Sequence, residues 1–145
     1  MEIDRDGKEV ASHAVPGGIN AARKLRTGEV AYVTLAGRCV RLDAAGKEVA
    51  NFEVSPTSPT GNMDLLPNGH VLLANYSGGK VTEFDEKGKE VWAATVQRPT
   101  SVARLANGHV LVCSLTGQCV IELDRDGKEV RKQPVEGRPY RASGR

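Results

Sequence analysis

The heptapeptide DRDGKEV occurs twice in this chain, at Asp4–Val10 and again at Asp124–Val130. Two close relatives of it lie in between, DAAGKEV at Asp43–Val49 and DEKGKEV at Asp85–Val91. The glycines of the four copies are spaced 39, 42 and 39 residues apart: Gly7, Gly46, Gly88 and Gly127. A fixed period of about 40 residues predicts a repeat architecture in which similar units stack side by side.

Two further landmarks keep the same rhythm. The first is a turn followed by valine, TGEV at Thr27–Val30 and NGHV at Asn68–Val71 and Asn107–Val110. The second is a glycine nine residues after the glycine of that turn, found in all three copies: Gly37, Gly78 and Gly117. Three landmarks in phase exclude chance similarity as the explanation of the period.

The best-formed copy predicts four strands joined by tight turns. We expect these strands at Thr100–Leu105, Val110–Leu115, Val120–Asp124 and Glu129–Val135. Asn107-Gly108 and Asp126-Gly127 are dipeptides that readily adopt the positive φ of hairpin turns. Helical spacing of apolar residues is absent from the sequence. Four antiparallel strands in every 40 residues predict an all-β fold, a β-propeller built of four-stranded blades.

Apolar residues recur at equivalent positions of the copies, which predicts a core between neighbouring blades. They are Leu25, Leu66 and Leu105 at the end of the first strand, Val30, Val71 and Val110 in the second, and Leu42, Phe84, Leu123 and Ile3 before the turn. A lone four-stranded sheet cannot bury both of its faces, so each blade has to pack against its neighbours.

The repeat divides the chain into three complete blades and two partial ones. The complete blades are expected at 17–54, 55–96 and 97–135, with third and fourth strands at 1–15 and the start of a first strand at 136–145. The two partial pieces together lack a second strand. Two explanations stay open: the chain is part of a longer propeller, or it closes its ring by pairing with other copies. We favour a half-propeller that self-associates, because unpaired sheet edges attract further strands.

Charge and composition exclude some classes of partner. The formal net charge is only +2, and each lysine of the Gly-Lys-Glu turns stands beside a glutamate, so a nucleic-acid surface is not expected. No apolar stretch is long enough for a membrane helix, and residues 1–15 lack the apolar region of a signal peptide. A cytoplasmic location is therefore the default expectation. Cys113 aligns with Val33 and Ala74 and is expected in the core.

Two segments carry a resemblance to known propeller families. Phe84–Trp92 (FDEKGKEVW) resembles the quinoprotein-like repeat, in which an apolar strand ends in Asp and is followed by a Gly-Lys turn and Trp. Leu66–Leu73 (LPNGHVLL) looks like repeats of NHL-type, arylsulfotransferase-like and lyase-like bacterial propellers. The other copies replace the Trp by Ala11, Ala50 and Arg131. The resemblance implies the fold, and its members include dehydrogenases, lyases, lactonases and binding modules, so it does not choose an activity.

The ligand face of a propeller is expected where the loops into the first strands and the turns after the second strands emerge. The residues predicted there are Asn20, Asn62, Arg98, Thr100, Arg138 and Tyr140 on the loops, Thr34, Asn75 and Ser114 near the ends of second strands, and Tyr76 beside them. They would bind a small polar or anionic ligand, with arginine contacting a carboxylate or phosphate. The simpler alternative is that these small polar side chains bind strand-end backbone groups. The loop at 55–61 interrupts the rhythm, which is a functional hint.

The histidines suggest a metal site that the rest of the pattern does not support. His70 and His109 occupy one repeat position, where the first blade has Glu29. We interpret them as polar residues after a turn and predict no metal and no cofactor. Two hypotheses remain for function. The favoured one is a non-catalytic module that binds a protein or small ligand, because the blades are nearly interchangeable. The other is a piece of a propeller enzyme with its site at the channel mouth.

Overall fold

The structure is a computed structural model that describes residues 1–12, 14–15, 17–54 and 62–139. These residues form strands and turns, and none of them lies in a helix. Accordingly, the described part of the chain contains no helix of the length and apolarity that a membrane crossing requires.

Three four-stranded antiparallel sheets make up most of the molecule. Blade 1 consists of β3 (Ile19–Lys24), β4 (Val30–Thr34), β5 (Arg38–Leu42) and β6 (Glu48–Glu53). Blade 2 consists of β7 (Met63–Leu65), β8 (Val71–Asn75), β9 (Lys80–Phe84) and β10 (Glu90–Thr95). Blade 3 consists of β11 (Pro99–Arg104), β12 (Val110–Ser114), β13 (Cys119–Leu123) and β14 (Glu129–Pro134). In each blade the strands follow one another in chain order across the sheet, which confirms the predicted fold class.

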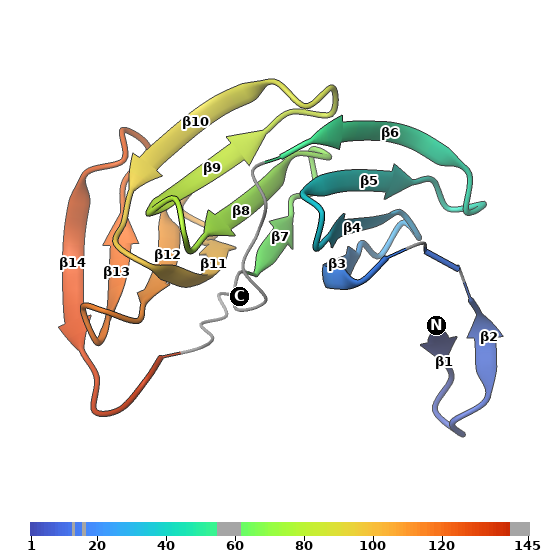
Figure 1. Cartoon of the computed structure of the whole chain (residues 1–145), viewed down its shortest axis with the longest axis horizontal. Helices are drawn as coiled ribbons and strands as arrows, with labels where there is room; N and C mark the ends of the chain where they lie inside the picture. Colours follow the sequence, from blue (N-terminus) through green and yellow to red (C-terminus); the bar gives the residue numbers. More distant parts are fainter. Residues whose placement is uncertain (13, 16, 55–61, 140–145) are drawn as a thin grey trace.

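The blades stand side by side in an arc, with β3, β7 and β11 on its inner side and β6, β10 and β14 on its outer side (Figure 1). Blade 2 lies between the other two, and both faces of its second strand are buried. Val71 and Leu73 pack with Val33 of blade 1, whereas Leu72 and Ala74 pack with residues of blade 3. This alternation follows from the two-residue period of a strand, which sends successive side chains to opposite faces. The repeat therefore allows a blade to bury both of its apolar faces, one against the preceding blade and one against the next.

The Asp-x-x-Gly turns explain why the heptapeptide recurs. In the turn after β13, the Oδ1 atom of Asp124 accepts hydrogen bonds from the backbone N–H of Asp126 and of Lys128, both at 2.9 Å. Gly127 has a φ of 79°, a left-handed conformation that favours glycine. The aspartates at 4, 43 and 85 make the same pair of bonds. The geometry of this turn thus explains why the aspartate and the glycine recur in each copy of the heptapeptide.

The outer strands of blades 1 and 2 each place an aromatic side chain on the turn of the next blade. Phe52 of β6 lies over Gly88, where an added Cβ would come within 2.4 Å of its ring. Trp92 of β10 lies beside Gly127, and its indole N–H donates a 2.9 Å hydrogen bond to the Arg125 carbonyl oxygen. Tryptophan docking, which the sequence retains in one copy, therefore joins blade 2 to blade 3.

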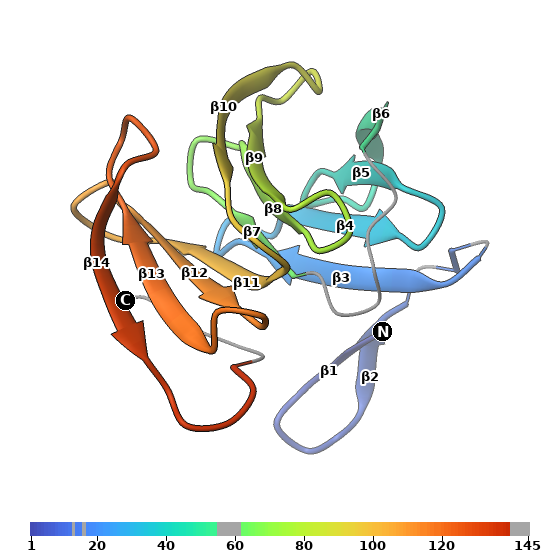
Figure 2. The same cartoon turned by 60° about the vertical axis from the view of Figure 1, so that its left-hand side comes forward.

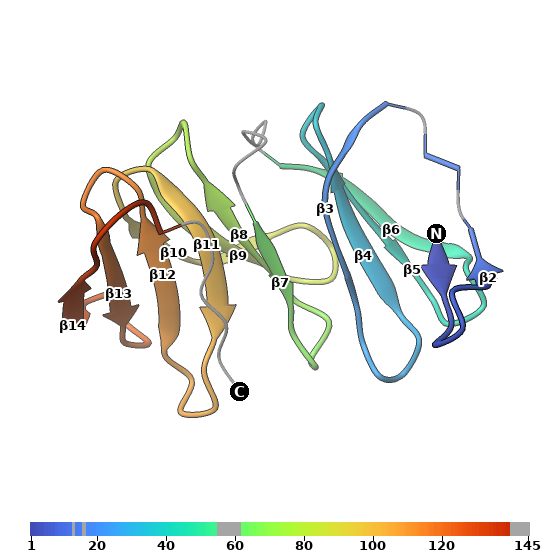
Figure 3. The same cartoon turned by 90° about the horizontal axis from the view of Figure 1, so that it is seen from below.

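A two-stranded hairpin, β1 (Glu2–Ile3) and β2 (Glu9–Ala11), precedes blade 1. It projects away from the three blades (Figure 2), and it lies at the blade 1 end of the array when the molecule is seen from below (Figure 3). The prediction of Ile3 as a core residue is wrong, because its side chain is 59% exposed. The equivalent Leu42 and Leu123 are buried because a full sheet surrounds them, and the hairpin has only two strands.

Candidate functional site

Three of the polar residues predicted at the channel mouth form hydrogen bonds with backbone groups near the ends of their strands. Thr34 Oγ1 accepts the backbone N–H of Arg38 at 3.1 Å, and Asn75 Oδ1 accepts that of Gly78 at 2.8 Å. Ser114 Oγ accepts the N–H of Gly117 at 3.2 Å and donates to the Gln97 carbonyl oxygen at 2.7 Å. These contacts favour the simpler alternative, in which small polar side chains bind strand-end backbone groups.

The loop residues among the predicted site are dispersed. Asn62 accepts a 3.1 Å hydrogen bond from Arg23 of blade 1, and it therefore joins two blades. Thr100 is fully buried and donates to the Pro139 carbonyl oxygen at 2.7 Å. Asn20 lies half-buried in β3 and Arg138 is exposed. Tyr140 and the loop at 55–61 lie outside the described residues.

Two of the predicted residues do meet. The guanidinium carbon of Arg98 lies 5.7 Å from the centroid of the Tyr76 ring, within the range of a cation–π contact. Arg98 is exposed and has a φ of 43°, which is uncommon for a residue other than glycine. This contact, between the β8–β9 turn and the loop before β11, joins blades 2 and 3.

The two histidines each contact a glutamate on the neighbouring strand. His70 Nδ1 lies 2.8 Å from Glu83 Oε1, and His109 Nδ1 lies 2.7 Å from Glu122 Oε1. The hydrogen bond from His109 is the main reason why the pKa of Glu122 lies below its usual value. Among the described residues, no three His, Cys, Asp or Glu side chains converge as a metal site would need.

A cluster of charged and aromatic side chains joins blades 2 and 3. Arg104 of β11 forms an ion pair with the buried Glu83 of β9, and its other terminal nitrogen donates to the Gly108 carbonyl oxygen at 2.9 Å. The guanidinium carbon of Arg104 lies 5.8 Å from the centroid of the Trp92 ring. Glu83 thus receives Arg104 on one oxygen and His70 on the other.

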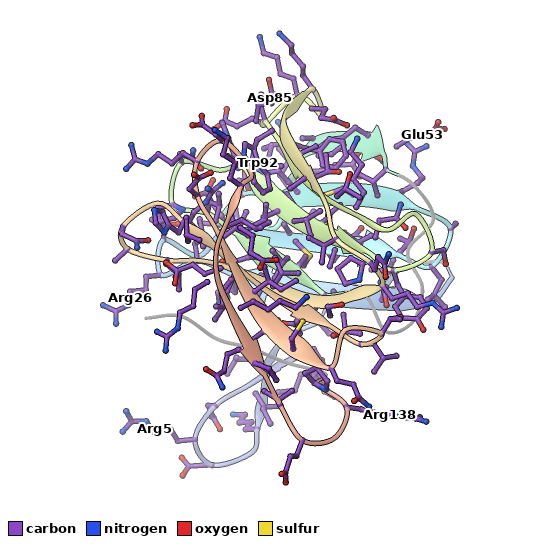
Figure 4. All side chains as sticks on the ribbon, turned by 90° about the vertical axis from the view of Figure 1, so that its left-hand side faces the viewer. Arg5, Arg26, Glu53, Asp85, Trp92 and Arg138 are labelled. Carbon is purple, nitrogen blue, oxygen red and sulfur yellow. The ribbon has the colours of Figure 1, made fainter. Side chains whose placement is uncertain are left out.

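A pocket of about 600 Å³ opens beside this cluster. Its lining residues come from two blades and combine apolar walls with two arginines and one carboxylate: Leu66, Pro67, Asn68, Glu83, Trp92, Arg104, Gly108 and Arg125. The volume is within the range of small-molecule sites. Trp92 lies far from Arg138 of the predicted ligand face in Figure 4.

Sequence reasoning did not find this pocket, although a signal was present. The repeat position of Glu83 is occupied by Arg41 in blade 1, and that of Arg104 by Leu65 in blade 2. A position whose charge or polarity differs between copies of the repeat does not have the same structural role in every blade. Such departures indicate where one interface between blades differs from the next.

In blade 1 the two positions of the His70–Glu83 contact carry the opposite arrangement of charge: Arg41 stands in place of Glu83, and Glu29 stands in place of His70. Arg41 is buried and lies 3.6 Å from Glu29, the residue at the histidine position. One of its terminal nitrogens and the Glu86 carboxylate lie so near Gly69 that an added Cβ would come within 2.7 Å of each. Arginine and carboxylate side chains therefore lie together beside the Gly69 turn.

The repeated meander and its arc of packed blades define this chain as a segment of a β-propeller. The sequence profile of the arylsulfotransferase (ASST) family matches residues 19–97, which is 79 of the 145 residues. The chain belongs to the arylsulfotransferase family. Comparison with curated protein sequences gives no significant match.

Solved structures support the fold. The chain is similar to a protein of unknown function from Bacteroides caccae, with 25% identity, a TM-score of 0.73, and coverage of 93% of this chain and 54% of the other. It is similar to virginiamycin B lyase from Staphylococcus aureus (18%, TM-score 0.64, coverage 83% and 42%). A third similar structure is BBS1N in complex with ARL6DN (18%, TM-score 0.68, coverage 87% and 44%). The chain thus spans about half the length of these proteins.

Proposed function

We propose that the chain is a non-catalytic β-propeller binding module that extends its ring by taking up a second copy of itself. The observation that carries the proposal is the outward face of blade 3. It repeats the face by which blade 2 packs on blade 3, and in the described part of the chain no further four-stranded sheet covers it. Solved propellers of similar structure include both a lyase and a complex with a protein, so the fold alone leaves this choice open.

The residues on that face match those of an interface already present inside the chain. Leu111 and Cys113 occupy the positions of Leu72 and Ala74. Leu72 and Ala74 are completely buried against blade 3. On the open face Cys113 is also buried, and Leu111, which is half-buried, is the residue left partly exposed. Because this apolar face is covered by a neighbouring blade in one copy of the repeat, we expect a blade of similar shape to cover it in the next copy.

Blade 1, at the end of the array where the β1–β2 hairpin also lies (Figure 3), supplies a matching surface. Ala31 and Val33 of β4 point toward blade 2, so the alternating Val30 and Tyr32 point away from it. Both are half-buried, and they occupy the positions by which blades 2 and 3 receive their preceding blade. A head-to-tail contact between two copies would therefore reuse the packing that joins neighbouring blades.

Charge placed on the open face tests this proposal. Leu111→Arg should reduce the sedimentation coefficient at high protein concentration to that of the monomer, because an unpaired charge cannot be buried between apolar sheets. Val91→Arg is the matched control, since Val91 is 46% exposed on the outer strand of blade 2 and lies away from both end faces. Equal sedimentation of the two variants and the parent chain would overturn the proposal.

A second candidate, part of a propeller enzyme, is favoured by the family match over residues 19–97. The corresponding activity is transfer of a sulfuryl group from an aryl sulfate to a phenol. Release of 4-nitrophenol from 4-nitrophenyl sulfate, dependent on a phenol acceptor and on protein concentration, would support this candidate over the binding module.

A further inference from the structure

The charges beside the pocket between blades 2 and 3 differ from those at the equivalent turn between blades 1 and 2. There Arg41 and Glu86 approach Gly69 together, and they bring one positive and one negative charge. At the equivalent Gly108 the nearest side chain is Arg125, whose Nε would lie 2.7 Å from an added Cβ. Arg125 thus stands where blade 2 has Glu86, and it places a second positive charge, besides that of Arg104, at the pocket.

The charges around the pocket are unequal. Arg104 and Arg125 both contact the Gly108 turn, Arg104 through the Gly108 carbonyl oxygen and Arg125 through a 3.3 Å hydrogen bond to the Asn107 carbonyl oxygen. The one acidic lining residue, Glu83, already receives Arg104 and His70. The Arg125 guanidinium therefore adds a positive charge that no lining carboxylate matches, and it lies at the exposed side of the pocket.

The remaining walls favour a flat apolar group. Leu66 is buried, Pro67 adds a rigid ring, and the Trp92 indole lies half-buried against Arg104. The hydrogen bond from the indole N–H to the Arg125 carbonyl oxygen fixes the ring in place. An aromatic ring with a defined position is a suitable platform for stacking.

We propose that this pocket binds a small planar aromatic carboxylate, with the carboxylate on the Arg125 guanidinium and the ring against Trp92. A guanidinium matches a carboxylate in geometry and can donate two parallel hydrogen bonds to it. The site lies within one chain, so it needs no second copy and no closed ring.

Trp92 is the only tryptophan of the chain, so its fluorescence and its indole N–H resonance report directly on the pocket. The probe is benzoate, with acetate supplying the charge without the ring and benzyl alcohol the ring without the charge. We expect benzoate to change both signals saturably, and the two control compounds to be much weaker. Added salt should weaken the binding of benzoate, because the Arg125 contact is exposed.

A matched pair of variants identifies the residue that takes the carboxylate. Arg125→Gln should weaken benzoate binding about ten-fold, the loss of one charge-assisted contact. It leaves the Trp92 hydrogen bond intact, because that bond goes to the main chain. Arg5→Gln is the control: Arg5 stands at the same place in an identical heptapeptide, but on the hairpin far from Trp92 (Figure 4). Absence of a saturable response to benzoate, or equal binding in the two variants, would overturn the proposal.

Discussion

Replacement of Glu83 by Gln removes the carboxylate that links blade 2 to blade 3 and keeps the size of the side chain. In the parent chain this carboxylate pairs with Arg104 across the interface and accepts a contact from His70 on the adjacent strand. The side chain of Glu83 is 11% exposed and that of Arg104 is 21% exposed. Glu83→Gln would therefore leave a mostly buried guanidinium without its counter-charge.

The size of the effect follows from that burial. Removing one partner of a fully buried ion pair costs about 3–5 kcal/mol. Arg104 keeps its hydrogen bond to the Gly108 carbonyl oxygen and some access to water, so we expect about 2 kcal/mol for this pair. For a chain of this length, that loss corresponds to a melting temperature lower by about 6–8 °C.

Thermal and chemical unfolding at one fixed protein concentration measure this loss, and Glu122→Gln is the matched control. Glu122 occupies the same repeat position and contacts His109, but among the described residues no arginine of a neighbouring blade forms an ion pair with it. Its replacement should lower stability much less. If the two variants lose the same stability, the account of the interface between blades 2 and 3 is wrong.

Three shorter predictions concern a turn, the thiols and a carboxylate. In denaturant titrations, Gly88→Ala should destabilise the fold by more than Gly7→Ala does. Both glycines have positive φ, but only at Gly88 does the new Cβ meet the Phe52 ring. Equal losses of stability in the two variants would refute this contact. Burial raises the pKa of the Cys39 thiol to about 12, so Ellman's reagent at pH 8 should react slowly with the native chain and rapidly after unfolding; a fast-reacting Cys39 in the folded protein would contradict its burial. The Lys89 backbone N–H lowers the pKa of Asp85 below 3.8, so its stabilising effect is complete above about pH 4 and is lost as pH falls through the folded-state pKa. A carboxyl NMR titration should place the Asp85 midpoint below 3.8, and a midpoint at or above that value would contradict the turn geometry.

The elements that the sequence predicted well are those that local chemistry determines. The strands of blade 3 were expected at Thr100–Leu105 and Val110–Leu115 and are found at Pro99–Arg104 and Val110–Ser114. Glycines with positive φ and turn aspartates fix where each strand can end, so the period alone locates them to within a residue. Cys113, expected in the core from its alignment with Val33, is buried.

Contacts between blades were beyond such reasoning. Glu83 and Arg104 are 21 positions apart and meet only because β9 and β11 belong to neighbouring sheets. Ile3 carries the sequence signal of a core residue, but its burial depends on strands that its hairpin lacks. Thr34 and Ser114 illustrate a further limit, since a small polar residue at a strand end suits a ligand site and a turn equally well.

Static light scattering of the unaltered chain over a wide range of concentrations tests the central proposal, association of copies through open blade faces. The account predicts a weight-average mass that rises from the chain mass of 15.5 kDa toward at least twice that value while the strand content stays constant. A well-folded species that remains at 15.5 kDa up to the highest concentration would contradict it.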